Sequence, residues 1–219
     1  MIIMKNNKLN LNLQFFAWAD IENDSPKTSD IEYTKIAPGA MITIRVLDAE
    51  PFSRYTHWLP LQKRSLTCGG STCPICEVIK SQRANKETPT YSKARRHILH
   101  VYNYETKRIE FFEQGNEVYK DLSAFHRMLG DIRNADLKVM KTGAGKDTKY
   151  TFMPQPPTPL DSAIQAEYEQ KRVDFAERFK APQPEDVRAL MSGKTFDEVY
   201  NQQNVQQKEE DEVSFVIAE

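Results

Sequence analysis

Alternation of apolar and polar residues, the period of a β-strand with one buried face, recurs in short stretches along the chain. It is clearest at residues 8–16, where every second side chain from Leu9 to Phe15 is apolar. Two pairs of stretches are joined by short turns, at Glu105–Lys107 and Gly143–Gly145, and so predict β-hairpins. The expected strands are residues 8–16, 41–47, 55–61, 95–104, 108–114, 137–142 and 148–153.

Helical spacing of apolar residues interrupts this strand pattern at Val118–Ile132. We also expect a short helix at residues 76–83, a longer one at 160–179 and further helical turns at 184–200. At least five short strands with a helix placed late among them favour a small β-barrel of the oligonucleotide-binding (OB) kind over a sandwich. The expected fold class is mainly β with α, whereas a helix-rich α/β fold is not supported.

Polar and proline-rich stretches predict where the chain divides. Residues 20–30 have the composition of a linker, and Pro154–Pro159 that of a stiff spacer. The four expected parts are an N-terminal arm and linker at 1–32, an OB-fold core at 33–154, a Pro-rich spacer with helices at 155–200, and a disordered acidic tail at 201–219.

The net charge of −1 conceals a segregation of charge along the chain. Residues 41–153 contain 19 Lys and Arg against 12 Asp and Glu, whereas residues 160–219 contain 7 against 14. A basic body indicates a polyanionic partner, and an acidic tail indicates a mimic of that partner or a docking peptide for other proteins. No apolar run approaches the roughly 20 residues that span a bilayer, so no membrane partner is expected.

All three cysteines of the chain lie within nine positions, and ten residues separate the first of them from His57. Four nitrogen and sulfur donors with a Cys-x2-Cys turn at one end are typical of a structural Zn2+ site. The fourth ligand stays open among four histidines, and we prefer His57 because it lies just upstream of the cysteine loop. The candidate ligands are His57, Cys68, Cys73 and Cys76, with His97, His100 and His126 as the competing histidines.

Two other readings of the cysteines are less favoured. An odd cysteine count cannot pair completely, and the opening Met-Ile-Ile-Met is too short for a signal-peptide core, so a disulfide framework is not expected. Cys73-Pro-Ile-Cys76 has redox spacing, but its third cysteine upstream and the lack of a thioredoxin-like βαβ pattern count against a redox role. Free thiols that bind a metal fit a reducing cytoplasm.

Basic and aromatic residues interleave through the β-rich body. Single-stranded nucleic acid is bound by such a mixture, because cations follow the phosphates while rings stack on bases without choosing among them. Four phenylalanines are instead expected in the core, namely Phe111, Phe112, Phe125 and Phe152. The candidate nucleic-acid-binding residues are Arg54, Tyr55, Trp58, Lys93, Arg95, Arg96, Tyr102, Tyr104, Lys141, Lys146, Lys149 and Tyr150.

The order of these features resembles the single-stranded DNA-binding, helix-destabilising proteins of T-even-type bacteriophages. A β segment, His57, a loop ending Cys73-Pro-Ile-Cys76, a short helix, the basic cluster Tyr91–Arg96, a hydrophobic strand and an acidic C-terminus follow one another. The resemblance covers roughly residues 36–153, although the four residues between the first two cysteines make a shorter loop than the family has. It implies an OB-fold barrel with an inserted zinc-binding subdomain whose ligands are His57, Cys68, Cys73 and Cys76.

The resemblance also implies a function, partners and a location. The protein would coat and protect single-stranded DNA without sequence preference in phage replication, recombination and repair, in the cytoplasm of the infected bacterial host. It would place Arg95 and Arg96 in a phosphate groove. Its acidic tail, Lys208–Glu219, would recruit replication and recombination proteins. The family binds cooperatively through a basic N-terminal segment, whereas this N-terminus has only Lys5 and Lys8 before the alternating strand. Self-association through the N-terminal arm is expected instead from that strand at 8–16, which can pair with an exposed edge in this molecule or in a neighbour.

An enzyme is not expected, because Gly143-Ala-Gly-Lys146 is too short for a phosphate-binding P-loop and lies between two strands. Three thiolates with one histidine also leave no open position on a metal. The alternative function is a zinc-stapled phage structural or interaction protein without single-stranded DNA-binding activity. It is favoured by residues 8–17, which look like the opening of some phage capsid and structural proteins.

Overall fold

The structure is a computed structural model, and it describes residues 31–200 apart from the side chain of Lys146. The expected strand at residues 8–16, the linker at 20–30 and the tail at 201–219 lie outside the described residues. None of the helices in the described part is long and apolar enough to cross a membrane.

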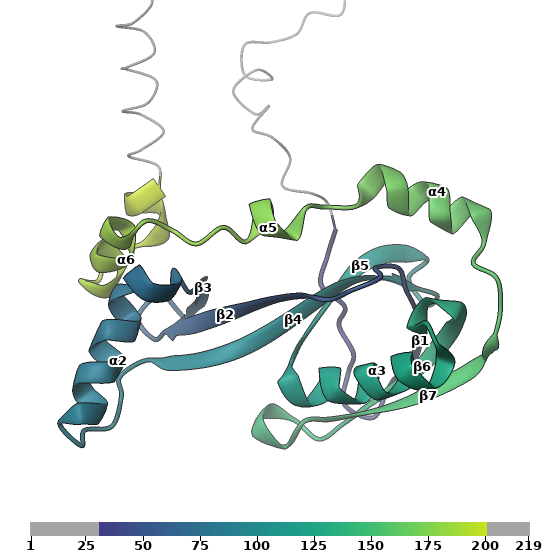
Figure 1. The fold of residues 1–219 in the computed structure, drawn as a ribbon, viewed down its shortest axis with the longest axis horizontal. Coiled ribbons are helices and arrows are strands. Elements are labelled where there is room, and N and C mark those ends of the chain that lie inside the picture. The colour runs from purple at the N-terminus through teal and green to yellow at the C-terminus, as the bar shows by residue number, and fades with distance from the viewer. Residues whose placement is uncertain (1–30, 201–219) are drawn as a thin grey trace, which may run out of the picture. The chain divides into compact units, whose positions relative to one another are not determined.

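Antiparallel strands within residues 31–200 form one seven-stranded sheet around the long strand β4 (Figure 1). β1 and β2 pair in succession with the same edge of β4, where Val46 faces Val101 and Phe52 faces Ile98. β5 pairs with the other edge of β4, while β1 continues the sheet to β6 and β7. The strands are β1 (Met41–Val46), β2 (Phe52–Leu59), β3 (Arg64–Thr67), β4 (Ser92–Asn103), β5 (Arg108–Gly115), β6 (Ala135–Thr142) and β7 (Lys149–Pro157).

Helices lie on both sides of β4, with α3 on one side and α4, α5 and α6 on the other (Figure 1). Apolar residues at helical spacing on α3, including Leu122 and Phe125, face the sheet. The helix ends at Leu129, and the next residue, Gly130, has a φ of 74°, which glycine adopts without strain. The helices are α2 (Pro74–Ala84), α3 (Asn116–Leu129), α4 (Ser162–Lys171), α5 (Phe175–Arg178) and α6 (Pro184–Met191).

Alternate residues of β4 contribute to two apolar cores on opposite faces of the sheet. Leu99 and Val101 enter the inner core, which contains Phe112, Phe152 and the apolar face of α3. Ile98 instead enters the outer core on the other face. The outer core consists of Ile31, Leu47, Ile98, Ile109, Phe111, Ile164, Tyr168 and Phe175.

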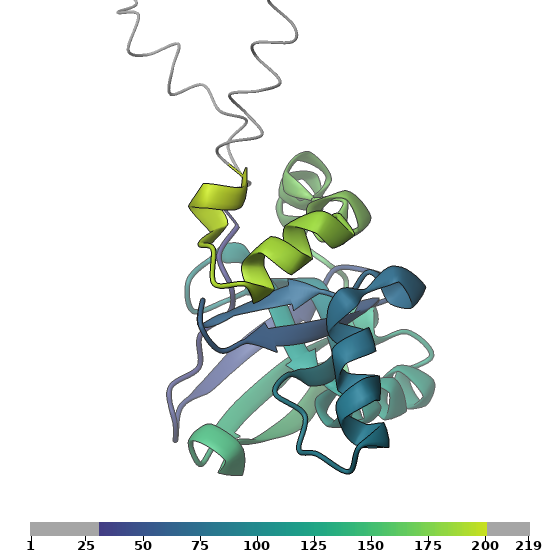
Figure 2. The same ribbon diagram turned by 90° about the vertical axis from the view of Figure 1, so that its left-hand side faces the viewer.

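A third core, which we call the knuckle core, lies beside the cysteine loop. It joins Leu59 of β2 and Ile75 of α2 to Val187 and Leu190 of α6. The side chain of Gln62 donates to the carbonyl of Leu190 at 2.7 Å and so secures the end of α6 against the turn between β2 and β3. Figure 2 shows the yellow-green C-terminal helices beside the blue β2–β3 hairpin. Residues 184–200 are therefore packed onto the segment that contains the cysteines.

Sequence patterns predicted most of this sheet correctly. Both hairpins, β1, β2, α2 and α3 are confirmed. Phe111, Phe112 and Phe152 are buried as expected, whereas Phe125 is half-buried and packs against the inner core. The prediction of a spacer at Pro154–Pro159 was wrong, because β7 continues to Pro157 as an edge strand, where a missing N–H is tolerated. The helix expected at 160–179 is broken at Arg172, and Asp174 caps a new helix, α5. The short strand β3 was not predicted.

Candidate metal centre and adjoining basic surface

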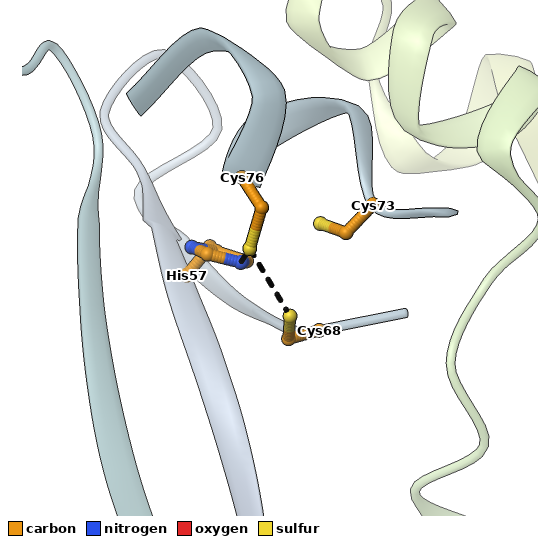
Figure 3. A group of neighbouring side chains, drawn as sticks. All are labelled: His57, Cys68, Cys73 and Cys76. Carbon is orange, nitrogen blue, oxygen red and sulfur yellow. Dashed lines mark hydrogen bonds between the residues drawn. The ribbon is translucent and has the colours of Figure 1, made fainter. Parts of the chain in front are cut away.

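One histidine and three cysteines converge beside the knuckle core (Figure 3). The ligand atoms of His57, Cys68, Cys73 and Cys76 all lie within 4.8 Å of one another, so the group could hold a metal ion. The sulfur atoms of Cys68 and Cys76 are 3.5 Å apart, close to the roughly 3.8 Å expected in a tetrahedron with metal–sulfur bonds of about 2.3 Å. The prediction of His57 as the histidine of the cluster is confirmed.

Three separate pieces of backbone bring these side chains together. His57 is in β2, and Cys68 directly follows β3. Cys73 is the N-cap residue of α2, and Cys76 lies in the first turn of that helix behind Pro74, whose fixed φ suits the first helical position. The knuckle core holds α2 against β2 and β3, and this packing fixes the positions of all four residues.

His57 is arranged to act as a neutral ligand. Its Nδ1 lies 3.0 Å from the carbonyl oxygen of Ser92 and donates its hydrogen there, which leaves Nε2 with a free lone pair. Nε2 faces the sulfur of Cys76 at 3.4 Å. Burial lowers the pKa of His57, so the imidazole stays uncharged at neutral pH.

The thiols have unequal environments. Burial raises the pKa of Cys68 to about 11. Burial also opposes ionisation of Cys73, but backbone N–H groups of Cys76 and Gly69 that point at its sulfur lower its pKa. Lys93 places its Nζ 3.4 Å from the sulfur of Cys76 and donates to it. The four ligand atoms are three sulfurs and one imidazole nitrogen, and the hydrogen-bond donors described above surround the sulfurs. Such a set fits a metal that prefers four soft or borderline ligands.

The other three histidines have different partners. Nδ1 of His100 lies 3.0 Å from the carboxylate of Asp48, beneath α4 and α5. His97 contacts Asn116 at the start of α3, and His126 accepts a hydrogen bond from a backbone amide near the end of that helix. None of them belongs to the cysteine cluster, which resolves the choice that the sequence left open.

Three of the predicted nucleic-acid-binding residues share one exposed face of the β2–β4 ladder. Tyr55 pairs with Arg95, and His57 pairs with Lys93, so these side chains lie on the same side of the sheet. Lys93 places its Nζ 4.8 Å from the centre of the Tyr55 ring. Arg95 forms no ion pair within residues 31–200. We call Tyr55, Lys93 and Arg95 the basic strip.

A pocket of about 510 Å³ continues from the basic strip. It lies between α3 and the connection from β1 to β2, and Arg95 is in its wall. His97 and Tyr119 form its floor with ring centres 4.8 Å apart. Lys120 and Arg127 of α3 line it as well, although neither was among the predicted nucleic-acid-binding residues. Their seven-residue spacing, which puts both on one face of a helix, was the signal available for finding them.

Arg54 and Arg96 lie on the opposite face of the same ladder. Both guanidinium groups pair with Glu113, at 3.0 Å from Arg54 and 3.2 Å from Arg96. Arg54 is also covered by the ring of Phe179, whose centre is 3.6 Å from its guanidinium carbon. The Arg54 side chain is only 11% exposed, so it contributes to packing beneath α5.

The remaining candidates are distributed over other surfaces. Tyr102 and Tyr104 pack edge to face beside the outer core, and the hydroxyl of Tyr104 donates to Asp136 at 2.9 Å. Trp58 is 44% exposed on the face of β2 that carries Arg54. The β6–β7 hairpin carries the last four candidates, Lys141, Lys146, Lys149 and Tyr150. Tyr150 packs against the inner core, and the side chain of Lys146 lies outside the described part.

Comparisons with protein-family models, curated proteins and solved structures gave no match to this chain.

Proposed function

We propose that this protein binds single-stranded DNA without sequence preference, through a surface that includes the basic strip. The observation that carries the proposal is the alignment of Tyr55, Lys93 and Arg95 on one exposed face, with Arg95 uncommitted to any acid within residues 31–200. An exposed ring stacks on bases of any identity, while flanking cations follow phosphates. The pocket beside α3 extends this surface.

The order of the strands supports an OB fold. β1 pairs with both β4 and β6, β5 follows β4, and α3 connects β5 to β6 before β7 ends the sheet. Five strands with these pairings fit a partly open barrel of the kind that binds oligonucleotides on one face. The β2–β3 hairpin and α2 would form an inserted zinc-binding subdomain.

We assign zinc to the cysteine cluster. Three thiolates and one imidazole make a closed, four-coordinate set, which zinc fills in structural sites without taking part in a reaction. In this role His57, Cys68, Cys73 and Cys76 would hold one Zn2+ per chain and fix α2 to the β2–β3 hairpin. The centre has no open position for a substrate, and an enzymatic activity is not part of the proposal.

The partners and setting that we propose follow the resemblance to the phage proteins. The acidic tail, Lys208–Glu219, would dock replication and recombination proteins and compete with DNA for the basic strip. Self-association through the N-terminal arm at residues 1–32 is proposed from the alternating strand expected at residues 8–16, not from the resemblance. The setting would be the cytoplasm of an infected bacterium, during DNA replication, recombination and repair.

Titration of a fluorescent oligo-dT with rising salt tests the proposal. We expect submicromolar binding at low salt, a linear fall of log affinity with log salt, and much weaker binding to a duplex of equal length. Absence of binding at low salt, or an equal affinity for duplex, would contradict it. That outcome, with the protein found in purified phage particles, would favour the alternative of a zinc-stapled structural protein.

A further inference from the structure

The pocket beside α3 has the construction of a ligand site rather than of a surface depression. Its volume of about 510 Å³ falls within the range of roughly 300–1,000 Å³ typical of small-molecule sites. One wall is the side of α3 that carries Lys120, Ser123 and Arg127, and the other includes Ser53 and Arg95 of the β2–β4 ladder. Its lining therefore combines cations with short polar side chains.

The floor of the pocket is rigid. His97, which is 7% exposed, stacks on Tyr119 and hydrogen-bonds at both ring nitrogens, to Ser53 Oγ at 2.7 Å and to Asn116 Oδ1 at 3.2 Å. The hydroxyl of Tyr119 donates to the carbonyl of Phe112 at 2.7 Å. These contacts hold the stacked pair in a fixed position in the lining of the cavity, where a planar ligand can extend the stack on its outer face.

Two of the three Lys and Arg residues that line the pocket form no ion pair within residues 31–200, whereas Lys120 pairs with Glu117 at 2.7 Å. One of the two acids of the lining is engaged as well. Arg95 has no ion-pair partner within the described chain, and Arg127 donates only to the neutral hydroxyl of Ser123, at 3.0 Å. Asp48 accepts hydrogen bonds from the backbone amide of His100 and the hydroxyl of Tyr168. Glu50 is the other acid of the lining and is exposed.

We propose that this pocket binds one nucleotide of the single strand, with its base extending the His97–Tyr119 stack and its phosphate at Arg95 and Arg127. The proposal rests on the proposed function and adds a fixed subsite to it. The strand register supports this arrangement: Tyr55 pairs with Arg95, and the next residues on that face are Ser53 and His97, in the pocket. A strand that follows the ladder from Tyr55 thus reaches the pocket directly.

A steric test uses two neighbouring positions of α3. Ser123→Trp fills the pocket, whereas Ala124→Trp places the same ring on an exposed position of the helix that does not line it. Wild type and both variants are titrated with fluorescein-labelled oligo-dT, and their thermal unfolding midpoints are compared. We expect Ser123→Trp to weaken binding about tenfold, because a base loses its stacking surface, and Ala124→Trp to bind like wild type.

A second, electrostatic test can contradict the proposal even if the Ser123→Trp variant does not fold. Arg127→Ala should lower the slope of log affinity against log salt by about one, while Lys80→Ala, an exposed cation of α2, should leave it unchanged. An unaltered slope in Arg127→Ala, or equal affinities for the two tryptophan variants, overturns the nucleotide pocket while DNA binding stands. A wild-type protein that binds no oligonucleotide overturns both proposals.

Discussion

Nζ of Lys93 lies 3.4 Å from the sulfur of Cys76, so one ammonium group contacts the candidate metal centre from the basic strip. The same ammonium lies 4.8 Å from the centre of the Tyr55 ring. A thiolate bound to a metal keeps negative charge, and a hydrogen-bond donor beside it is held in place. The metal centre can therefore orient the surface that we propose for DNA without touching DNA itself.

Replacing Lys93 with glutamine should weaken oligo-dT binding about fivefold, a loss of roughly 1 kcal/mol, because the strip loses a phosphate-binding cation. The metal should stay bound, since all four ligands are unchanged. Fluorescence anisotropy and elemental analysis of the same preparations measure both quantities. Lys80→Gln, an exposed lysine of α2, is the matched control and should bind like wild type. Equal affinities for the two variants would remove Lys93 from the interface.

The metal centre should contribute strongly to stability. Cys76→Ser removes one of four ligands, and we expect the purified variant to lose its zinc and at least about 3 kcal/mol of unfolding free energy, or roughly 6–12 °C in Tm. Ser71→Ala, in the same loop, should keep both. Chelation of zinc from the wild type should reproduce the Cys76→Ser result, and a metal-free wild-type protein with unchanged Tm would contradict the assignment.

Phe175 should be part of the folded domain although it lies far beyond the last strand in sequence. It is 8% exposed, and its ring stacks on His100 with centres 4.3 Å apart. Phe175→Ala should cost about 3 kcal/mol, as is usual for emptying a buried aromatic site. Leu61→Ala, at a side chain 73% exposed, should change stability by less than about 0.5 kcal/mol. Urea unfolding followed by circular dichroism measures both, and equal midpoints would place Phe175 outside the cooperative unit.

Local sequence patterns predicted what depends on local chemistry. The Cys-x2-Cys turn identified the cluster, because Cys73 and Cys76 are brought together by the start of one helix. Strand alternation predicted both hairpins, whereas the pairing of Tyr55 with Arg95 belongs to the β2–β4 ladder and is known only from the structure.

Long-range packing was not accessible to these patterns. Arg54 was selected as a surface cation, but its burial depends on Phe179, which is 125 residues away in the sequence and reaches it only through the path of α5. Lys120 and Arg127 were overlooked because a polar helix face is ordinarily solvated, and only the opposing strand makes it the wall of a pocket.

The acidic tail lies outside the described residues, and its expected effect rests on charge alone. Residues 160–219 contain 14 acids against 7 bases, and deleting Lys208–Glu219 removes five of those acids with one lysine. The truncated protein should bind oligo-dT with equal or severalfold higher affinity at low salt, since a competitor for the cations is gone. Replacing the tail acids with Gln and Asn at full length is the control for chain length. A clear loss of affinity in either protein would refute competition by the tail.

Tyr104 should make stability fall at alkaline pH. Burial, reinforced by its hydrogen bond to Asp136, raises the pKa of Tyr104 to about 12, above the value of about 10 in an unfolded chain. As the pH rises, Tyr104 therefore loses its proton in the unfolded state before it does so in the folded state. Its contribution to the free energy of unfolding is complete below pH 10 and declines as the pH rises towards 12. Tyr104→Phe cannot ionise, and its urea midpoint should fall less between pH 9 and about 11.5 than that of wild type. Tyr55→Phe, at an exposed tyrosine, should follow the wild-type curve, and identical curves for all three proteins would contradict the assignment.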